Sequence, residues 1–319
     1  MRIAIYTCLS PLFGRFCHSW ESILGGLGHE VTVIELPMNW KKPLPSQEKA
    51  DVNLFVGGGS MLWMLMTHGF PGVGKNVVWM FEPVLKRNTL AQIGTKILRR
   101  LKAIIGMEAK DFHYGKIKVM DEIGHRFDAI IGMNALITSY VQKYLPGIPT
   151  IEIPYTIDPK DIISPIPEAE RKIDVLQLGR HSPRRKRAEK LFNQKGVEAR
   201  FIYGGLYNED RYKVIPQAKI SLQIHGGKPF YFSQHRIFEA WAAGSLVLSE
   251  PFSPKLDGVE AGIHLIVADL ENFPDVCTRL LADREKRNEI VNASQALLKS
   301  SFVPNKWSDS LIGFLTSVG

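Results

Sequence analysis

The stretch QHRIFEAWAAGSLVLSEPF at residues 234–252 decides the fold class of this chain. Its first part, residues 234–243, has the apolar spacing of a helix and stops at Gly244, a residue type that commonly ends helices. A short apolar strand at residues 245–249 follows without a loop. A helix that leads straight into a buried strand is typical of the βαβ units that build parallel sheets.

The same alternation extends along the chain in both directions. Short β-rich runs lie in the first half at residues 2–7, 30–36, 51–56, 76–81, 127–131 and 149–153. Further runs lie at residues 173–178, 199–203, 219–224 and 263–267, and helical patterns at residues 184–193, 207–215 and 274–298 separate or follow them. Strands that alternate with helices predict α/β domains with parallel sheets.

A segment with four prolines, IPYTIDPKDIISPIPEA at residues 153–169, divides the pattern into two similar halves. Proline fixes φ and lacks a backbone donor, so this segment is expected to be an interdomain linker. The sequence therefore predicts two Rossmann-like domains facing a cleft, at residues 1–155 and 170–300, followed by a C-terminal helix at residues 301–319. In open parallel sheets, ligands bind beyond the carboxyl ends of the strands.

Composition limits the class of protein. The net charge of +8 favours anionic partners such as nucleotide phosphates, acidic lipid or nucleic acid. The sparse cysteines Cys8, Cys17 and Cys277 argue against a disulfide framework. The N-terminus has the pattern of a first strand rather than a signal peptide, and no apolar run is long enough to span a bilayer. These features favour a cytoplasmic protein.

A basic run, GRHSPRRKR at residues 179–187, directly follows a predicted strand and opens a predicted helix. The N–H groups and dipole of a helix N-terminus favour a phosphate, and Arg or Lys side chains add charge-assisted hydrogen bonds. The candidate phosphate ligands are Arg180, Arg184, Arg185 and Lys186. The alternatives are a solvated basic face and a nucleic-acid patch. His225 also follows a predicted strand and could line the same site.

Arg236 and Glu239 are three residues apart and share one face of the helix in the deciding stretch. A carboxylate aimed into a cleft can accept both hydroxyls of a ribose, whereas an exposed Arg236–Glu239 ion pair is the simpler alternative. No G-x-G-x-x-G fingerprint follows a strand, which weighs against an NAD-dependent dehydrogenase.

The stretch RIFEAWAAGSLVLSEPF resembles the group-1 glycosyltransferase signature, in which a Glu precedes a small-residue helix end, a Gly and a strand. It is most similar to the spore-maturation-protein-like branch. Segments that fit this branch in the same order are VVWMFEP at 77–83, FDAIIGMN at 127–134, IPYTID at 153–158, IDVLQLG at 173–179 and the tail at 280–298. The resemblance covers roughly the C-terminal two-thirds of the chain, is strongest at residues 173–298, and implies the GT-B fold.

By this resemblance, Glu239 would hold the donor ribose, and Arg180 with Lys186, Arg184 or Arg185 would bind the diphosphate of a nucleotide-sugar. Gly204, His225 and Arg236 complete the expected donor site. Many retaining members carry a second Glu eight residues before the ribose Glu, where this chain has Tyr231. This departure leaves retention or inversion open. The tail that contains Trp307 is expected to return to the first domain, as GT-B tails do.

The first half offers weaker candidates. A glycine run, Gly57-Gly58-Gly59-Ser60, follows a predicted strand, and with Gly14 it could bring backbone close to a ligand or simply form a tight turn. Glu82 in FEP could be a catalytic base or a capping residue, and His18, Asp111 and His113 rank lower. The helical pattern at residues 89–105 has an apolar stripe and basic flanks, so it could pack on the sheet or contact the inner membrane face.

The predicted function is sugar transfer from a nucleotide-sugar donor to a glycan, a lipid-linked or a small-molecule acceptor. No metal and no cofactor are expected, because Arg and Lys can stabilise the departing diphosphate. A nucleotide-sugar epimerase of the same fold and an inactive binding module are alternatives. A basic nucleic-acid-binding protein is a further alternative but leaves the 234–252 stretch unexplained, so no nucleic-acid partner is expected.

Overall fold

The computed structural model describes residues 1–8, 13–36, 44–45, 50–71, 73–81, 120, 122–164, 166–204, 210–226, 231–253 and 255–318. The chain forms two compact units. The N-terminal unit comprises Met1–Ile153 together with the C-terminal segment Asp309–Gly319, and the C-terminal unit comprises Pro154–Ser308. The boundary between them lies at the start of the proline-bearing segment.

The N-terminal unit is built on a six-stranded, entirely parallel sheet with the order β2-β1-β3-β4-β5-β6. Its strands are β1 (Arg2–Thr7), β2 (Glu30–Glu35), β3 (Val52–Gly57), β4 (Lys75–Met80), β5 (Ala129–Gly132) and β6 (Thr150–Glu152). The central strand β3 is buried along its whole length, as expected for a parallel sheet covered on both faces.

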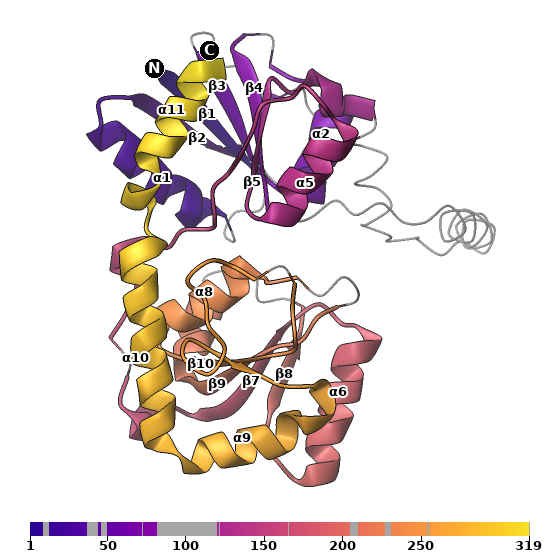
Figure 1. The fold of residues 1–319 in the computed structure, drawn as a ribbon, viewed down its shortest axis with the longest axis vertical. Helices are drawn as coiled ribbons and strands as arrows, with labels where there is room; N and C mark the ends of the chain where they lie inside the picture. Colours follow the sequence, from indigo (N-terminus) through magenta and orange to yellow (C-terminus); the bar gives the residue numbers. More distant parts are fainter. Residues whose placement is uncertain are drawn as a thin grey trace, which may run out of the picture. The chain divides into compact units, whose positions relative to one another are not determined.

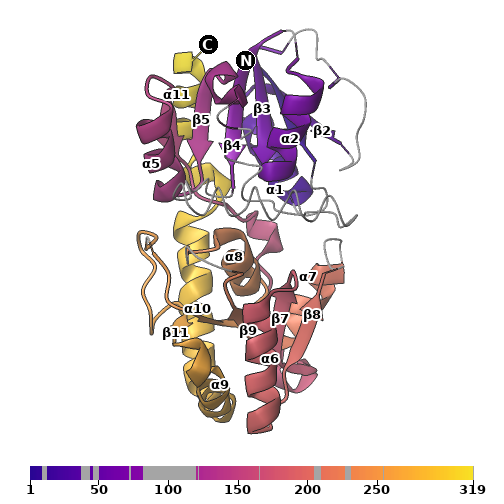
Figure 2. The same ribbon diagram turned by 90° about the vertical axis from the view of Figure 1, so that its right-hand side faces the viewer.

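Helices cover both faces of this sheet. Helices α1 (Gly14–Gly26) and α11 (Ser308–Val318) lie on one face, and α2 (Gly59–His68) and α5 (Ala135–Tyr144) lie on the other (Figures 1 and 2). An aromatic cluster joins α1 to β4, because the rings of Phe16 and Trp79 meet edge to face at 5.0 Å. Both rings are buried, and so is Trp20 of the same helix. Rings of this size dominate the energetics of a core.

The C-terminal unit is built on a second parallel sheet, with the order β11-β10-β9-β7-β8. Its strands are β7 (Ile173–Gly179), β8 (Arg200–Tyr203), β9 (Ala218–Gln223), β10 (Leu246–Ser249) and β11 (Ile266–Val267). The chain runs from β7 to its neighbour β8 on one side and then to β9 on the other side of β7. Reversal of the winding direction beside β7 is the mark of a doubly wound, Rossmann-like sheet.

Helix α6 (Pro183–Lys195) lies on one face of this sheet, and α8 (Gln234–Ala242) and α10 (Arg284–Ser301) lie on the other (Figures 1 and 2). Helix α9 (Phe273–Ala282) packs against both α6 and α10, and the short α7 (Asp210–Val214) precedes β9. Val175, Phe192 and Phe273 belong to one buried apolar core that these elements share. None of the helices in the described part of the chain is both long and apolar enough to cross a bilayer.

Local sequence signals explain where the helices begin and end. The Ser182 hydroxyl accepts the Arg185 backbone N–H at 3.2 Å and caps α6, with Pro183 at its first position and Gly196 in the left-handed conformation at its end. The expected helical region 274–298 forms two helices, because Asp283 caps α10 by accepting the Lys286 N–H at 2.9 Å. The strand expected at 263–267 is shortened to Ile266–Val267, because Gly262 turns the chain with a φ of 86°.

Candidate functional site

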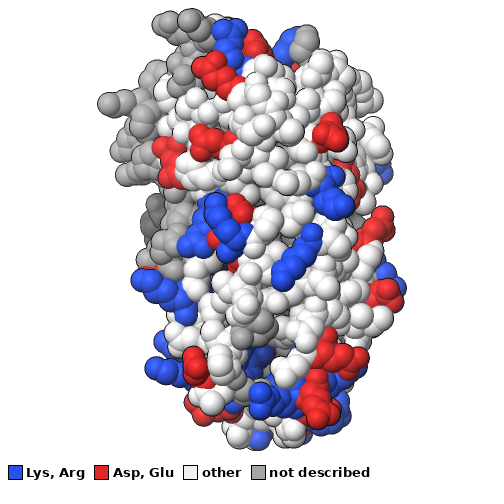
Figure 3. Space-filling view, turned by 90° about the vertical axis from the view of Figure 1, so that its left-hand side faces the viewer, with Lys and Arg blue, Asp and Glu red and all other residues white. Residues whose placement is uncertain are grey.

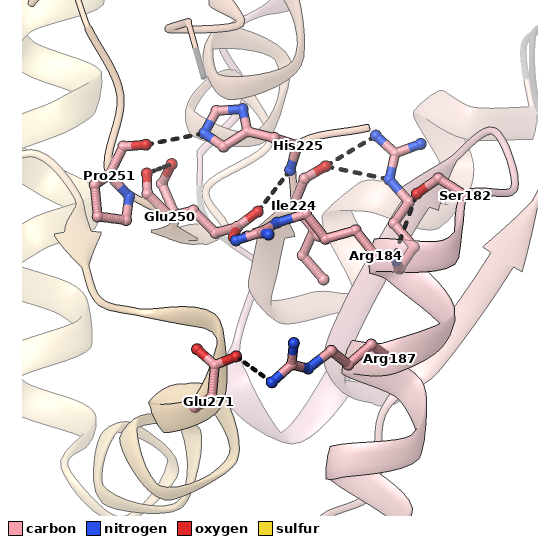
Figure 4. A network of polar contacts seen from close by, with 10 residues as sticks. Ser182, Arg184, Arg187, Ile224, His225, Glu250, Pro251 and Glu271 are labelled. Atoms are coloured by element: carbon pink, nitrogen blue, oxygen red, sulfur yellow. Dashed lines mark hydrogen bonds and ion pairs between the residues drawn. The ribbon is translucent and has the colours of Figure 1, made fainter. Parts of the chain in front are cut away.

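The point where the winding of the C-terminal sheet reverses lies between the carboxyl ends of β7 and β9. In open α/β sheets, ligands bind in the crevice outside this point. Here the N-terminus of α6 follows β7 after only three residues, and Ile224 and His225 follow β9. Figure 4 shows that side chains from α6 and from the ends of β9 and β10 meet in one polar network. Arg184 and His225, both expected in the donor site, belong to this network.

Arg185 braces the two loops at this edge. Its side chain is buried, with 3 % of its surface exposed. Its guanidinium donates to the Ile224 carbonyl at 2.9 and 3.1 Å and to the Arg180 carbonyl at 2.6 Å. The Arg185 guanidinium thus supports the main chain of both loops, and its expected contact with a phosphate stays a prediction.

Gly179, the last residue of β7, makes room for this brace. Its φ is 149°, and a Cβ built at Gly179 would lie 2.7 Å from Nη1 of Arg185. Its carbonyl accepts the N–H of Gly204 at 3.1 Å, which joins the ends of β7 and β8. Gly204 itself has a φ of 77°. Two glycines thus keep the backbone close together where the expected donor site begins.

Glu250, which immediately follows β10, is the central acid of the network and is fully buried. One carboxylate oxygen accepts Nε of Arg184 at 2.7 Å, and the other accepts the backbone N–H of His225 at 2.8 Å (Figure 4). Arg184 keeps 35 % of its side chain exposed. A buried carboxylate needs such charge-assisted bonds, so Glu250 fixes the orientation of Arg184 at the edge of the site. The same contact raises the pKa of Arg184.

His225 is held in its neutral form. Burial lowers its pKa, and this effect outweighs the opposing influence of Glu250. Its Nε2 lies 3.2 Å from the Pro251 carbonyl, which can only accept a hydrogen bond. We therefore assign the ring proton to Nε2, which makes Nδ1 an acceptor. His225 thus presents a neutral polar ring rather than a charge.

The remaining basic candidates differ in exposure. Arg180 and Lys186 are exposed at the start of α6, whereas Arg236 is half-buried in the first turn of α8. Arg187, which was not a candidate, pairs with Glu271 at 2.8 Å on the outer side of α6 (Figure 4). Arg180 and Lys186 therefore carry the accessible positive charge beside the helix N-terminus.

Glu239 does not lie on an exposed face. Its side chain is 2 % exposed, and it pairs with Arg211 of α7 inside the C-terminal unit. The simple alternative of a solvent-exposed ion pair at Glu239 is wrong, because the carboxylate is buried. A buried carboxylate that keeps its charge costs desolvation free energy and is retained only with such a partner.

The comparisons with known proteins agree with this geometry. Residues 169–313 match the model of a family described as glycosyl transferase-like. The whole chain superposes on sucrose-phosphate synthase from Thermosynechococcus elongatus with a TM-score of 0.64 and 11% identity, covering 100% of both chains. Anabaena HepE in complex with UDP and glucose gives a TM-score of 0.60 at 12% identity, covering 99% of this chain and 100% of HepE.

A glycosyltransferase from Rickettsia africae gives a TM-score of 0.59 at 9% identity, covering 99% of this chain and 98% of that one. These findings support a glycosyltransferase of the GT-B type. At such low identities the solved structures show the shared fold, while the family match covers the unit that holds the polar network. A sequence comparison with curated proteins gives no match.

In the N-terminal unit, the expected glycines lie at the carboxyl edge of the sheet. Gly57 ends β3, Gly58 precedes α2, Gly59 begins it, and Gly14 begins α1 after β1. Ser60 lies in the first turn of α2. This edge is again the point where the winding reverses, between β1 and β3.

His18 of α1 is held between two carboxylates. Its Nδ1 lies 2.8 Å from Glu21, and its Nε2 lies 3.3 Å from Glu35 at the end of β2. The ring is 54 % exposed, so it is accessible but already partnered on both nitrogens. Glu82, Asp111, His113 and the 89–105 segment lie outside the described residues.

Sequence reasoning missed Glu250 and Arg211. Glu250 had a recognisable signal, since it is an acid that directly follows a buried strand in SLVLSEP, in the same way as Glu82 in FEP. Arg211 had none, because its partner Glu239 is 28 residues away along the chain. Only the folded C-terminal unit brings the two charges together.

Proposed function

We propose that this glycosyltransferase uses a nucleotide-sugar donor, with the diphosphate at the N-terminus of α6 and the ribose on Glu239. The observation that supports this most is the network at the carboxyl ends of β7, β9 and β10. It combines a helix N-terminus with an oriented Arg184, at the point of the sheet where nucleotides bind in doubly wound folds. The complexes of HepE with UDP and with UDP-glucose support the same donor class.

The chemistry asked of the protein is electrostatic. Breaking the bond between sugar and diphosphate leaves negative charge on the diphosphate, and donors aimed at that charge stabilise the transition state. The N-terminus of α6, Arg184, Arg180 and Lys186 would supply this stabilisation without a metal ion. Neutral His225 would contribute a polar contact and no charge. This assignment of charge is the basis for proposing a metal-independent reaction.

For the acceptor, we propose only a chemical class. The TarM structure in complex with fondaparinux, alpha-GlcNAc-glycerol and UDP has the same fold, which favours a glycan or sugar-bearing acceptor here. In that comparison the match covers 82% of this chain and 55% of the TarM chain. Similarity to the spore-maturation-protein-like branch remains a proposal that rests on the segments at 77–83, 127–134 and 173–179.

The test is the ribose contact of Glu239. We expect Glu239→Gln to weaken UDP-glucose binding by about 10- to 150-fold, because charged hydrogen bonds contribute about 1.5–3 kcal/mol. A 2′,3′-dideoxy analogue should bind wild type and variant almost equally, since it lacks the two ribose hydroxyls that Glu239 is proposed to bind. Isothermal titration with both ligands measures the two affinities.

The analogue also separates the ribose role from a general loss of structure. If Glu239→Gln binds both ligands more weakly by the same factor, the carboxylate acts only through its pair with Arg211. If the variant binds UDP-glucose as tightly as wild type, the ribose assignment is wrong.

The diphosphate contact is tested separately. We expect Arg180→Ala and Lys186→Ala to weaken UDP binding by about ten-fold or more and to leave uridine binding almost unchanged. Both side chains are exposed, so neither change should disturb the fold. Lys190→Ala, an exposed cation further along α6, is the matched control. Equal losses for UDP and uridine would place the basic residues away from the phosphates.

A further inference from the structure

The ion pair between Arg211 and Glu239 lies in the interior of the C-terminal unit. The side chain of Arg211 is 9 % exposed and that of Glu239 is 2 % exposed, and Nη2 of Arg211 donates to Oε2 of Glu239. Two buried charges cost desolvation free energy, and apolar residues in place of such a pair are often neutral or stabilising. Stability alone therefore gives little reason for this pair, which points to a role in binding.

Both residues lie on helices that start from the carboxyl edge of the sheet. Helix α7 comes after β8 in the chain, and Arg211 is its second residue. Helix α8 comes after β9, and Glu239 lies in its second turn. The same edge carries the network of Arg184 and Glu250. The pair therefore belongs to the side of the C-terminal unit where nucleotides bind in doubly wound folds.

The guanidinium of Arg211 has a donor that the ion pair does not use. Within the part of the chain that the structure describes, Nε of Arg211 is buried and has no hydrogen-bond partner. Nε–H and one N–H of Nη2 point to the same side of the planar guanidinium and form a fork of two donors. Because Nη2 contacts Glu239, an acceptor at Nε would lie beside the Glu239 carboxylate. A buried N–H without an acceptor is unfavourable, so Nε indicates the position of a ligand oxygen.

A hydroxyl group fits this position better than other ligand groups do. A carboxylate only accepts hydrogen bonds and a guanidinium only donates them, whereas a hydroxyl does both. A hydroxyl beside the pair can therefore donate to Glu239 and accept from Nε of Arg211 with the same oxygen. A phosphate at this place would be repelled by the carboxylate, and an ammonium group would be repelled by the guanidinium.

We infer that Arg211 is a specificity-determining residue for the nucleotide, and that with Glu239 it selects a ribonucleotide over a deoxyribonucleotide. The inference rests on the proposed ribose contact of Glu239 and adds a second contact to it. Nε of Arg211 donates to the oxygen of a ribose hydroxyl, and Glu239 accepts the hydrogen of that hydroxyl. A site built to bond a hydroxyl rejects the analogue that lacks it, because its buried polar groups are then left without partners.

The test compares the binding of UDP, 2′-deoxy-UDP and 3′-deoxy-UDP by calorimetry. Wild type should bind UDP about ten-fold or more tightly than at least one deoxy analogue. Arg211→Lys keeps a cation beside Glu239 but loses the fork, because an ammonium group is a point charge. We expect it to weaken UDP binding by about ten-fold or more and to leave binding of that analogue almost unchanged. Arg187→Lys is the matched control, since Arg187 pairs with Glu271 on the outer side of α6, and it should bind all three ligands as wild type does.

A second variant keeps the test decisive if Arg211→Lys does not fold. Removal of one charge from a buried pair is strongly destabilising, whereas replacement of both charges is often tolerated. The double variant Arg211→Met/Glu239→Gln should therefore unfold at a urea concentration close to that of wild type, and it should bind UDP and the deoxy analogues almost equally. A double variant that still prefers UDP by the wild-type factor would overturn the inference.

The outcomes separate Arg211 from the proposed function. If Glu239→Gln loses the preference for UDP but Arg211→Lys keeps it, the inference for Arg211 is overturned and the ribose contact of Glu239 stands. Equal weakening of all three ligands by Arg211→Lys would also overturn the inference, because Arg211 would then act only through the fold. If wild type binds the three ligands equally, the ribose contact itself is wrong and both assignments fail.

Discussion

His225 is a residue whose environment sets the pH dependence of the C-terminal unit. It faces the carboxylate of Glu250, the guanidinium of Arg184 beyond it, and the Pro251 carbonyl. Burial is the largest influence and lowers the pKa of His225 below its ordinary value. The unfolded chain therefore takes up a proton at a higher pH than the folded chain does.

This difference in proton uptake determines how stability changes with pH. The contribution of neutral His225 to stability is complete above the unfolded pKa of about 6.5, and it is lost as the pH falls from there towards the lower folded pKa. We expect the free energy of unfolding in urea to fall between about pH 7 and pH 5, and His225→Gln to make this fall shallower. His264, whose pKa burial also lowers, contributes in the same direction, so part of the slope should remain. A steeper slope in His225→Gln would contradict the assignment.

Residue types at strand ends indicated the site, but they did not indicate which side chain contacts a ligand. Arg184 and Arg185 are neighbours with the same charge, yet Arg184 lies at the edge and Arg185 is buried beneath Gly179. A one-residue step along a helix turns the side chain by about 100°, and the phase of α6 relative to the sheet follows from packing. The pairing of Glu239 with Arg211 is likewise a tertiary contact that no local pattern specifies.

Among the elements, the turn from β7 into α6 has a strict steric requirement. Gly179 combines a φ of 149° with a close approach to a guanidinium that hydrogen bonds to main chain hold in place. We expect Gly179→Ala to lower the free energy of unfolding by about 1–3 kcal/mol or more, since an L-residue is strained there and Arg185 must move. UDP affinity should fall with it.

Gly226→Ala is the matched control, because a Cβ at Gly226 meets no atom within 4 Å and its φ is not positive. This change should leave stability within about 0.5 kcal/mol of wild type. Urea unfolding of both variants measures the difference. Equal stability of the two would mean that the β7–α6 turn adapts easily, and the bracing role of Arg185 would then be wrong.

Elements with strong local signals could be predicted from the sequence. The helix predicted at residues 234–243 is observed as α8 at Gln234–Ala242, because Gly244, with a φ of 69°, ends it. Helix caps and turns that interrupt an apolar pattern were harder to predict from the sequence. Asp283 interrupts an otherwise continuous helical pattern with a cap, and a turn that begins at Gly262 shortens the apolar run 263–267 to the two residues of β11. In both places a hydrogen bond or a positive φ overrides a pattern of side chains.

At the scale of the whole molecule, the net charge of +8 is the property that bears on its partners. On the face in Figure 3, Lys and Arg side chains alternate with Asp and Glu side chains. Part of the excess of 40 basic over 32 acidic residues is local, because Arg180, Arg184 and Lys186 lie around the start of α6. Local clusters suit small phosphorylated ligands better than a long polyanion, which needs a continuous basic track.

The three cysteines report on the two units separately. Cys8 and Cys17 are buried in the N-terminal unit and Cys277 is buried in the C-terminal unit. Burial raises the pKa of Cys8 to about 12 and raises the pKa values of Cys17 and Cys277 as well. The thiolate is the reactive form, so all three should react slowly with iodoacetamide until their unit unfolds.

UDP should therefore protect the thiols unequally. A ligand present at 100 times its dissociation constant stabilises the unit that binds it by about 2.7 kcal/mol. We expect saturating UDP to move the labelling of Cys277 to a higher urea concentration and to shift Cys8 and Cys17 less. Mass spectrometry of labelled peptides across a urea series, with and without UDP, gives the three midpoints. Protection of Cys8 and Cys17 alone would place the nucleotide in the N-terminal unit and would overturn the donor site proposed at α6.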